Sequence, residues 1–505
     1  MSPAEPRRAM DGYPVPPPTM TDLYELTMAA GYWKLGRLDD RAIFTLFFRH
    51  APFDGGFTLA AGLEGVIAFI ERYAFAPAEL AHLASLLGND ERPLFEPRFL
   101  DYLAGLRLAV DVDAMPEGTL AFPHEPLLRV AGPLLHGQLL ESALLNLVNY
   151  PTLAATKAAH VVMAAGGAPV MEFGLRRAQG PDGALTASRA AYLGGCNATS
   201  NVLAGRLFGI PVRGTHAHSW VLSFESEQAA FDAWADVMPG NAVLLVDTFD
   251  TEEGVANAIE TGRRMRERGQ KLAGIRLDSG DLAYLSVRAR ELLDAAGFED
   301  TQVVASNDLD PATMESLQAQ GARIDSWGVG TKLVTCYDQP ALGGVYKLTA
   351  IQEAGAPAGS WRTPVKVSAD TAKITVPGQL AVRRFYDADG TARADMIWDE
   401  LQATDGSRVI VDPVDSHHRL TIDAGWTSRE VLVPVFRGGE RVYDPPPLAE
   451  ARDHARHELG TLHPAILRQL RPHWYPAGLE WGLHTRREAL IEAELAPDIA
   501  GAPAG

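Results

Sequence analysis

A polar segment follows a short apolar run near the middle of the chain. Residues 209–212 (GIPV) read as a buried strand, and RGTHAHSW (213–220) comes directly after them. Because α/β proteins carry reactive side chains at the carboxyl ends of their strands, a histidine, a threonine and a serine there indicate chemistry. His218 could serve as a general base, a metal ligand or a phosphoryl acceptor. A histidine that only hydrogen-bonds to a loop is an equally good interpretation of this segment alone.

Metal binding by this segment is the weaker alternative. His216 and His218 are two residues apart, which places both on one face of an extended chain. A zinc site needs a third protein ligand, and none stands nearby in the sequence. The two cysteines, Cys196 and Cys336, form no CxxC pair, so neither a cysteine-based zinc site nor a disulfide framework is expected.

A second polar segment, IRLDSGDL (275–282), follows another apolar run. If the strand continues into this segment, Arg276 and Asp278 point to the same side. Gly280 lets backbone amides approach an anion, and the following helix would present its N-terminus. An arginine suits a carboxylate, and aspartates suit sugar hydroxyls or Mg²⁺. The alternative is a tight turn in which Asp281 caps the next helix.

Two other strand ends carry groups that suit a phosphate and an aromatic ring. Gly328, Gly330 and Thr331 form a GxGT sequence late in the chain, where barrel loops commonly bind phosphate through amides and a hydroxyl. Phe173 and Arg176 follow an earlier strand and would stack on a flat ring and hold a phosphate. Taken alone, this second pair is better explained as a core phenylalanine and a surface arginine.

Strand–loop–helix repeats from residue 169 onward must position these segments. The predicted strands cover residues 170–173, 212–214, 242–246, 272–275, 303–305, 325–329 and 345–348. Helical segments separate most of them, at intervals of roughly 20–40 residues. This rhythm predicts a parallel α/β barrel, although an open parallel sheet would have the same strand count.

The remainder of the chain divides around that barrel. Thr21 is the expected N-cap of a helix over residues 21–32, in which Tyr24 alone would be read as a core residue. Residues 141–165 have a helical pattern that Pro151 should divide into two helices. We expect a flexible leader (1–18), an N-terminal α+β domain (19–150), the α/β-barrel catalytic domain (151–365), a C-terminal β-rich and helical region (366–495) and a flexible tail (496–505).

Size, composition and charge exclude several classes of protein. A chain of 505 residues exceeds the usual single core, and its 47% hydrophobic content is that of a soluble globular protein. A net charge of −19 argues against nucleic acid or an anionic membrane as a partner. Because the first 18 residues lack an apolar signal core and no long apolar window follows, we expect a cytoplasmic protein without a membrane span.

Taken together, the segments resemble the nicotinate phosphoribosyltransferases, a type II phosphoribosyltransferase family. The resemblance covers about residues 20–350 and rests on TDLYELTMAAGYW (21–33), FTLFFRHAPFDGGFTLAAGLE (44–64), VMEFGLRRAQGPDG (170–183), RGTHAHSW (213–220), IRLDSGDL (275–282), ASNDLD (305–310) and WGVGTKLVTC (327–336). It implies the α/β class: an irregular parallel α/β barrel of the type II phosphoribosyltransferase kind, with an additional α+β domain built from the N-terminal and C-terminal parts.

The resemblance also implies a reaction. Members of the family condense nicotinate with 5-phosphoribosyl 1-diphosphate to nicotinate mononucleotide and diphosphate, using Mg²⁺, in NAD biosynthesis and salvage by the Preiss–Handler route. ATP is a co-substrate whose hydrolysis is coupled through a phosphohistidine, which the resemblance places at His218. Asp247, after the strand that ends at Val246, would orient this histidine. The resemblance further implies a homodimer with shared active sites.

The pyridine ring would be held by residues from several segments. The resemblance places Tyr24 and Phe173 on its two faces, with Tyr24 reaching in from the other subunit, and Arg276 and Thr215 at its carboxylate. Relatives that take the amide carry an aspartate near the ring, and that position falls at Ser200 here. A serine does not repel a carboxylate as a buried aspartate would, so the acid is favoured.

The phosphoribosyl part would be held by glycine amides, a cation and carboxylates. The resemblance assigns Arg176 to a phosphate, and Thr331, with Gly328 and Gly330, to the ribose 5-phosphate. It assigns Asp278, Ser279 and Asp281 to the ribose or to the diphosphate, with the two aspartates also as candidate Mg²⁺ ligands.

Three other functions remain as alternatives. Two belong to the same class, a nicotinamide phosphoribosyltransferase and a quinolinate enzyme, and the latter has a much shorter chain and needs additional basic residues. The third is a barrel that senses a nucleotide without turnover. The presence of His218, Arg276 and Asp278 argues against it, since a sensor needs no phosphoryl acceptor.

Overall fold

The structure is a computed structural model that describes residues 15–500, apart from residues 358, 369–372 and 403–405. The chain forms two compact units: Ala154–Pro340, and Met1–Leu153 together with Ala341–Gly505. Most of the predicted leader and the end of the predicted tail, residues 1–14 and 501–505, lie outside the described residues. Residues 496–500 belong to the last helix, α16 (Trp481–Ala500).

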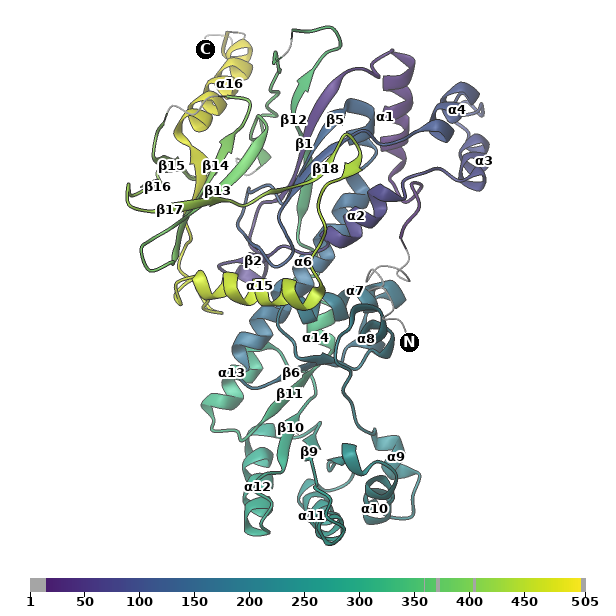
Figure 1. Ribbon diagram of the computed structural model, residues 1–505, viewed down its shortest axis with the longest axis vertical. Coiled ribbons are helices and arrows are strands. Elements are labelled where there is room, and N and C mark those ends of the chain that lie inside the picture. Colours follow the sequence, from purple (N-terminus) through teal and green to yellow (C-terminus); the bar gives the residue numbers. More distant parts are fainter. Residues whose placement is uncertain (1–14, 358, 369–372, 403–405, 501–505) are drawn as a thin grey trace, which may run out of the picture. The chain divides into compact units, whose positions relative to one another are not determined.

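The unit from residue 154 to residue 340 is built on a six-stranded sheet in which all strands are parallel (Figure 1). In sheet order these are β7 (Ala198–Thr199), β6 (Val170–Glu172), β11 (Ser326–Val329), β10 (Gln302–Ala305), β9 (Gly274–Leu277) and β8 (Val243–Leu245). Its strands are short runs of aliphatic residues that are largely buried, as expected of a parallel sheet covered by helices.

The segment before His218 lies between the two ends of this sheet. Val212 forms a parallel bridge with Thr199 of β7. On its other side, the Thr215 hydroxyl donates to the Val243 carbonyl of β8, and the Leu245 amide donates to His216 Nε2 at 3.3 Å. Side-chain hydrogen bonds from Thr215 and His216 therefore close the barrel next to β8, where the described residues of this segment and of β8 make no backbone-to-backbone hydrogen bonds. The predicted irregular parallel α/β barrel is confirmed, and the predicted strand at 212–214 is reduced to a single bridge residue.

Helices connect the strands of the barrel. They are α7 (Gly180–Leu193), α8 (Val202–Phe208), α9 (His218–Leu222), α10 (Glu227–Val237), α11 (Thr251–Glu267), α12 (Leu282–Ala295), α13 (Pro311–Ala319) and α14 (Thr331–Val334). Asp250, Asp281 and Asp310 cap α11, α12 and α13, because each carboxylate accepts backbone N–H groups of the first turn. These caps fix the points at which the loops after β8, β9 and β10 turn into helix.

Two details of the barrel differ from the sequence-based prediction. The last predicted strand, residues 345–348, is part of β12 (Gly344–Gln352), which pairs antiparallel with β1 (Arg41–Phe48) in the other unit. The barrel instead gains β7, which was not among the predicted strands. A two-residue strand leaves too short an alternation for sequence periodicity to reveal.

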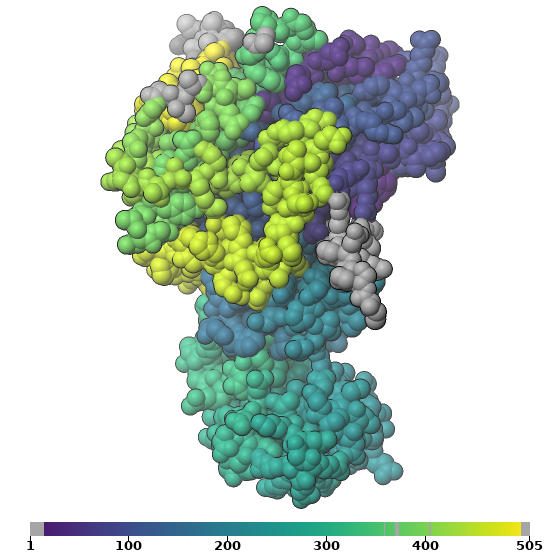
Figure 2. Space-filling view, viewed as in Figure 1, coloured from purple at the N-terminus to yellow at the C-terminus, as the bar shows by residue number. Residues whose placement is uncertain are grey.

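The second unit combines both ends of the chain, as predicted for the additional α+β domain. One antiparallel sheet has the order β12, β1, β5 (Leu128–Pro133), β3 (Asp111–Ala114), β18 (Val433–Arg437) and β19 (Glu440–Arg441). Another has the order β16 (Arg419–Thr421), β15 (Val409–Val411), β20 (Ala477–Glu480), β14 (Ala392–Asp399), β13 (Leu380–Tyr386) and β17 (Thr427–Glu430), and a small pair joins β2 (Thr58–Leu59) to β4 (Leu120–Ala121). The pairing of β3 with β18 joins the two ends of the chain, and Figure 2 shows the yellow-green C-terminal residues packed against the blue N-terminal ones.

The helices of this unit are α1 (Leu23–Lys34), α2 (Leu63–Glu71), α3 (Pro77–Ser85), α4 (Pro97–Gly105), α5 (Leu134–Gln138), α15 (Leu448–Thr461) and α16. The predicted cap Thr21 is displaced by one residue, because Asp22 is the N-cap of α1 and the Thr21 hydroxyl donates to Glu25 instead. Among the described residues, no helix is long and apolar enough to cross a membrane.

A cluster of buried charged residues links the N-terminal and C-terminal parts of this unit. The Arg384 guanidinium is fully buried and donates to Asp395, to Glu458 and to the Leu120 carbonyl. A buried guanidinium tolerates the loss of water only when its donors are satisfied, and here both carboxylates and a backbone oxygen satisfy them. Burial, reinforced by Asp395, raises the pKa of nearby Glu125 well above its usual range.

The helix expected to break at Pro151 is continuous. It forms α6 (Glu141–Ala164), with the proline inside it. The proline ring removes one intrahelical hydrogen bond and frees the carbonyl four residues earlier, that of Leu147. Gly62 has no side chain and lies so close to this carbonyl that an added Cβ would collide with it. Tertiary packing thus overrides the local helix-breaking tendency.

Candidate active site

Five polar side chains meet at the carboxyl ends of β8, β9 and β10. We call them the strand-end cluster: His218, Asp247, Arg276, Asp278 and Ser306. Parallel strands end on the same edge of a barrel, which brings residues from distant parts of the sequence together there. The cluster unites the two polar segments that the sequence singled out.

His218 is the first residue of α9 and faces two carboxylates. Its Nδ1 lies 3.1 Å from the Thr248 hydroxyl, while its Nε2 lies 3.8 Å from Asp278 Oδ2 and 4.0 Å from Asp247 Oδ1. The imidazole side chain is 39% exposed, so Nε2 is accessible to a ligand. With Nδ1–H donating to Thr248, Nε2 would carry the free lone pair that a nucleophile or a base needs.

Asp247 joins the loops after β8 and β9. Its side chain is 1% exposed, and Oδ2 accepts from the Asp278 amide at 3.0 Å and from the Ser279 hydroxyl at 2.5 Å. Its other oxygen, Oδ1, is buried and has no hydrogen-bond partner among the described residues. A buried carboxylate oxygen without a partner is costly, so it is suited to a cation or a protonated imidazole.

Arg276 is held in a fixed orientation. Its Nε donates to the Ser306 hydroxyl at 2.7 Å and its Nη2 to Asp278 Oδ1 at 2.9 Å. The guanidinium carbon also lies 5.7 Å from the centre of the Phe173 ring. Nη1 makes no hydrogen bond to any described residue, and it remains available for a carboxylate ligand beside that ring.

Ser306 belongs to the strand-end cluster but was not predicted from the sequence. It is 3% exposed and its hydroxyl also donates to Asp278 Oδ1, so one side chain fixes both members of the ion pair. The segment ASNDLD (305–310) was among the motifs of the resemblance, but no role was assigned to it. Its position, directly after a buried strand, is the signal that could have identified this serine.

Phe173 owes its place to a glycine on the neighbouring strand. A Cβ at Gly328 of β11 would lie 2.6 Å from the Phe173 ring, far inside van der Waals contact. A Cβ at Gly330 would lie 3.1 Å from the Phe173 carbonyl oxygen. Gly328 is therefore required for the present position of the Phe173 ring, and Gly330 packs tightly against the backbone of the same residue. This explains their presence without any phosphate, and their predicted amide contacts to phosphate stay a prediction.

The comparisons with known proteins agree with one another. Models of the nicotinate phosphoribosyltransferase family match residues 19–149 (N-terminal domain), 169–389 (the family model) and 380–487 (C-terminal domain). A nicotinate phosphoribosyltransferase of Bacillus subtilis (strain 168) is 43% identical, over 94% of this chain and 96% of its own. The chain belongs to the nicotinate phosphoribosyltransferase family, and it is an enzyme.

Relatives of the nicotinate phosphoribosyltransferase family also come from distant organisms. The nicotinate phosphoribosyltransferase of Homo sapiens is 37% identical over 94% of this chain and 96% of its own. The crystal structure of human nicotinic acid phosphoribosyltransferase superposes with a TM-score of 0.78 and 34% identity, covering 93% of this chain and 99% of that one. A nicotinate-nucleotide pyrophosphorylase structure from Pyrococcus furiosus, 20% identical with a TM-score of 0.67, shares the fold.

Two residues that the family resemblance assigns to the substrates make hydrogen bonds within the protein, and their ligand roles stay predictions. The Thr215 hydroxyl donates to the carbonyl of Val243, at the start of β8, while the strand-end cluster lies at its far end. Asp281 Oδ1 accepts the amides of Ala283 and Tyr284, both at 3.1 Å, as an N-cap of α12. The interpretation of Asp281 as a helix cap thus accounts for that oxygen.

Other predicted residues of the family site lie on the loops after β6, β7 and β11. Arg176 is exposed in a short 3₁₀ turn, Leu175–Arg177. Thr331 is the first residue of α14, beside the ion pair of Lys332 with Asp310. Ser200 is half-buried, and its amide donates to the Glu172 carbonyl at 2.9 Å. Within the part of the chain that the structure describes, no hydrogen bond joins these three side chains to the strand-end cluster, and their ligand roles stay predictions.

His216 has a structural role. It is 5% exposed, its Nε2 accepts the Leu245 amide, and its ring packs edge-on against Trp234 with centroids 5.0 Å apart. Burial lowers the pKa of His216, which favours the neutral imidazole that this hydrogen bond requires. The histidine therefore helps to close the barrel.

The donor set suits Mg²⁺ better than a transition metal. In the part of the chain that the structure describes, no three or more His, Cys, Asp or Glu side chains are arranged to hold a metal ion. Mg²⁺ commonly takes only one or two carboxylates and completes its shell with substrate phosphates and water. Asp247 Oδ1, which has no partner among the described residues, and Asp278 Oδ2, which faces His218, are carboxylate oxygens of this kind.

Proposed function

We propose that this enzyme condenses nicotinate with 5-phosphoribosyl 1-diphosphate to nicotinate mononucleotide and diphosphate, and that ATP hydrolysis drives the reaction through a phosphohistidine at His218. The observation that carries the proposal is the juxtaposition of a fixed arginine, an aromatic ring and an accessible imidazole flanked by carboxylates. The names of the relatives support the substrates, and the cluster supports the coupling. The product would feed NAD biosynthesis.

The pyridine would be bound by the Phe173 ring and by the Arg276 guanidinium. Its face would stack on Phe173, and its carboxylate would accept Nη1–H of Arg276, which lies near the same ring. The pyridine nitrogen then attacks ribose C1, the bond between C1 and the diphosphate oxygen breaks, and diphosphate leaves with the electron pair. No proton has to move, so the protein positions the reactants and stabilises charge.

Charge development explains the carboxylates. Positive charge builds on the sugar as the diphosphate departs, and Asp278 lies where it could accept ribose hydroxyls. Mg²⁺, when bound, would neutralise the diphosphate, and Asp247 and Asp278 are the residues that would hold it. Asp281 is a weaker candidate because one of its oxygens caps α12.

The ATP step would use His218 Nε2. This nitrogen attacks the γ-phosphorus, an N–P bond forms, the bond from γ-phosphorus to the bridging oxygen breaks, and ADP leaves. Water later cleaves the N–P bond and releases phosphate. A phosphate placed between Asp247 and Asp278 would repel both carboxylates, so phosphorylation would rearrange these loops and change substrate affinity.

The choice of nicotinate over nicotinamide rests on Ser200 and Arg276. An amide-specific site needs an acceptor for the amide N–H groups, whereas a serine in place of an aspartate does not repel a carboxylate and a guanidinium attracts it. A shared active site in a homodimer is part of the proposal, with Tyr24 of one subunit covering the ring bound to the other. Tyr24 is 45% exposed on α1, as such a role requires.

A product assay tests the proposal. Nicotinate, nicotinamide and quinolinate are offered separately with 5-phosphoribosyl 1-diphosphate and Mg²⁺, each with and without ATP. We expect the mononucleotide only from nicotinate, and faster formation with ATP. Equal turnover of nicotinamide would refute the assignment of the acid.

Labelled ATP tests the covalent step. Incubation with [γ-³²P]ATP should give protein-bound label that is stable in alkali and labile in acid. The label should be absent from His218→Ala and present in His82→Ala, a matched exposed histidine of α3. Label that persists in His218→Ala would remove this histidine from the ATP step while leaving the condensation itself untouched.

A further inference from the structure

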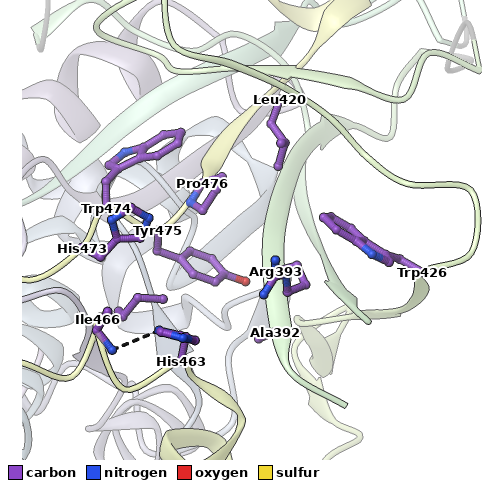
Figure 3. Close-up of a pocket in the computed structure, with 11 residues that line it drawn as sticks. Ala392, Arg393, Leu420, Trp426, His463, Ile466, His473, Trp474, Tyr475 and Pro476 are labelled. Atoms are coloured by element: carbon purple, nitrogen blue, oxygen red, sulfur yellow. Dashed lines mark hydrogen bonds between the residues drawn. The ribbon is translucent and has the colours of Figure 1, made fainter. Parts of the chain in front are cut away.

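A cavity lies far along the sequence from the strand-end cluster, in the unit that contains both chain ends. It has a volume of about 470 Å³, a size typical of small-molecule sites. We call it the tryptophan pocket; its polar and aromatic lining consists of Arg393, Trp426, His463, His473, Trp474 and Tyr475. Figure 3 shows Trp474 and Trp426 on opposite sides of this space, with Tyr475 between them.

The lining has one sign of charge. None of the eleven residues around the pocket is an aspartate or a glutamate, although the chain carries 64 acidic residues against 45 basic ones. Among the described residues, Arg393 forms an ion pair with Asp387, whose Oδ2 lies 3.8 Å from Nε, too far for a hydrogen bond. Arg393 is the one charged side chain among the eleven lining residues, and two histidines lie beside it in a protein with a net charge of −19. The pocket would attract an anion.

Its hydrogen-bonding groups are mainly donors without partners. In the described part of the chain, the Arg393 guanidinium and the indole N–H groups of Trp426 and Trp474 make no hydrogen bond. His463 uses only Nδ1, which accepts the Ala465 amide at 3.1 Å. The Tyr475 hydroxyl, in contrast, is committed, because it donates to Asp395 of the buried charge cluster at 2.8 Å. The pocket thus contains hydrogen-bond donors that are available to a ligand, and the Tyr475 ring is held in place by its hydrogen bond to Asp395.

The aromatic groups offer flat surfaces. Trp474 is 46% exposed, and the ring of His418 lies 5.6 Å from it. Trp426 packs against the hydrophobic cluster that contains Phe385. The Arg393 guanidinium carbon lies 5.9 Å from the centre of the Trp426 ring. Exposed indole faces beside a cation are suited to a planar ring that bears a negative group.

We propose that the tryptophan pocket binds a small planar aromatic anion of mononucleotide size, with its ring on Trp474 and its phosphate on Arg393. This site is separate in sequence from the strand-end cluster and requires no part of the proposed catalytic reaction. AMP serves as the probe. Nicotinate mononucleotide, which carries the same chemistry on a pyridine ring, forms a second arm that tells whether purine or pyridine is preferred.

Hydrogen–deuterium exchange locates the bound probe. AMP should slow exchange of the amides in residues 463–475, whereas ligands of the strand-end cluster protect residues 275–281. Adenosine lacks the anion and ribose 5-phosphate lacks the ring, and each should protect residues 463–475 only at concentrations about tenfold higher or more, equivalent to about 1.4 kcal/mol. Stronger protection by nicotinate mononucleotide than by AMP would support the site and assign it a pyridine ligand.

Two variants and one control test the named contacts. Arg393→Ala and Trp474→Ala should each weaken AMP binding at residues 463–475 by about tenfold or more. Arg419→Ala is the matched control: this arginine also lies over a tryptophan, Trp481, at 5.3 Å but does not line the pocket. It should change binding less than about twofold. Absence of AMP protection at 463–475, equal protection by adenosine, or equal loss in Arg393→Ala and Arg419→Ala would overturn the proposal. Loss of nicotinate turnover would not affect it.

Discussion

The ion pair of Arg276 with Asp278 shows how one small residue sets the geometry of a site. Ser306 donates to the carboxylate and accepts from the guanidinium, so neither group can rotate without losing a partner. A side chain whose orientation is fixed in advance loses less entropy when it binds a ligand. In this site the fixed orientation leaves Nη1 beside the Phe173 ring.

Arg276→Ala should raise the KM for nicotinate about 100-fold, because a charge-assisted hydrogen bond contributes about 1.5–3 kcal/mol. The KM for 5-phosphoribosyl 1-diphosphate should change much less. Ser306→Ala should also raise the KM for nicotinate more than the KM for 5-phosphoribosyl 1-diphosphate, but by a smaller factor. The guanidinium is still present in this variant, but its orientation is no longer fixed. Steady-state kinetics with each substrate varied in turn measure both effects.

Arg288→Ala is the matched control for the arginine. It removes an exposed guanidinium of α12 that pairs with Glu252 and Glu291, and both KM values should remain as in the wild type. If Arg276→Ala raised both KM values equally, the arginine would not bind the carboxylate of nicotinate specifically.

At the scale of elements, the site depends on the close approach of β6 and β11. The loop after β6 carries Phe173, whose amide donates to the Val329 carbonyl at 2.8 Å. Glu172, at the end of β6, is 1% exposed and accepts from Ser188 and Thr199, which ties β6 to α7 and β7. These contacts place the aromatic ring over Gly328, where only a glycine fits.

Gly328→Ala should therefore act on substrate binding through Phe173. Its new methyl group would lie 2.6 Å from the ring as now placed, so the ring must move. We expect a rise of at least about tenfold in the KM for nicotinate, together with a loss of about 1–3 kcal/mol in stability from overpacking. Gly240→Ala, an exposed glycine with nothing within 4 Å of an added Cβ, is the control and should match the wild type in kinetics. Unchanged nicotinate binding in Gly328→Ala would contradict the stacking role of Phe173.

At the scale of the whole molecule, a shared active site predicts complementation between subunits. Tyr24 lies on α1, where Leu23 and Met28 are also exposed, and His218 lies in the barrel. Tyr24→Ala and His218→Ala should each lose most ATP-coupled activity. After both variants are unfolded and refolded together, mixed dimers would contain one intact site, so about a quarter of all sites should be restored.

Size-exclusion chromatography must show the dimer before and after mixing. Two preparations of the same variant, refolded together, provide the baseline. If the mixture were no more active than that baseline, Tyr24 and His218 would act within one chain.

The pH dependence of stability follows from buried histidines. Burial lowers the pKa of His124 and of His136 to about 4, against about 6.5 when the chain is unfolded. Between these pH values the unfolded chain binds protons that the folded chain excludes, so the free energy of unfolding falls as the pH drops from about 6.5 to about 4. Above about pH 6.5 both states are neutral at these residues, and they contribute no pH dependence.

His124→Asn tests this expectation. Asparagine tolerates the positive backbone φ of 69° at this position and does not titrate. The loss of unfolding free energy between pH 7 and pH 4.5 should be smaller than in the wild type by about 2–3 kcal/mol. Denaturant titrations followed by circular dichroism at each pH measure it, and an unchanged slope would assign the acid sensitivity to other groups.

The sequence by itself determined the parallel strand–helix alternation and most of the strand-end cluster, while closure into a barrel was implied by the family resemblance. Buried aliphatic runs of four or five residues ending in Asp247, Arg276 and Asp278 are local patterns, and parallel strands must end on one edge. The family resemblance added the chemistry that such an edge performs.

Only the tertiary structure decided which polar groups actually meet. Thr215 helps to close the barrel, Asp281 caps a helix, and Gly328 makes room for the Phe173 ring. The sequence pattern did not show these contacts, and the ligand roles predicted for the same residues stay predictions. Ser306, the continuity of α6 through Pro151 and the two-residue β7 depend on contacts between residues far apart in the chain. Hydrogen bonds and close packing of this kind are satisfied in three dimensions, and a linear pattern does not contain them.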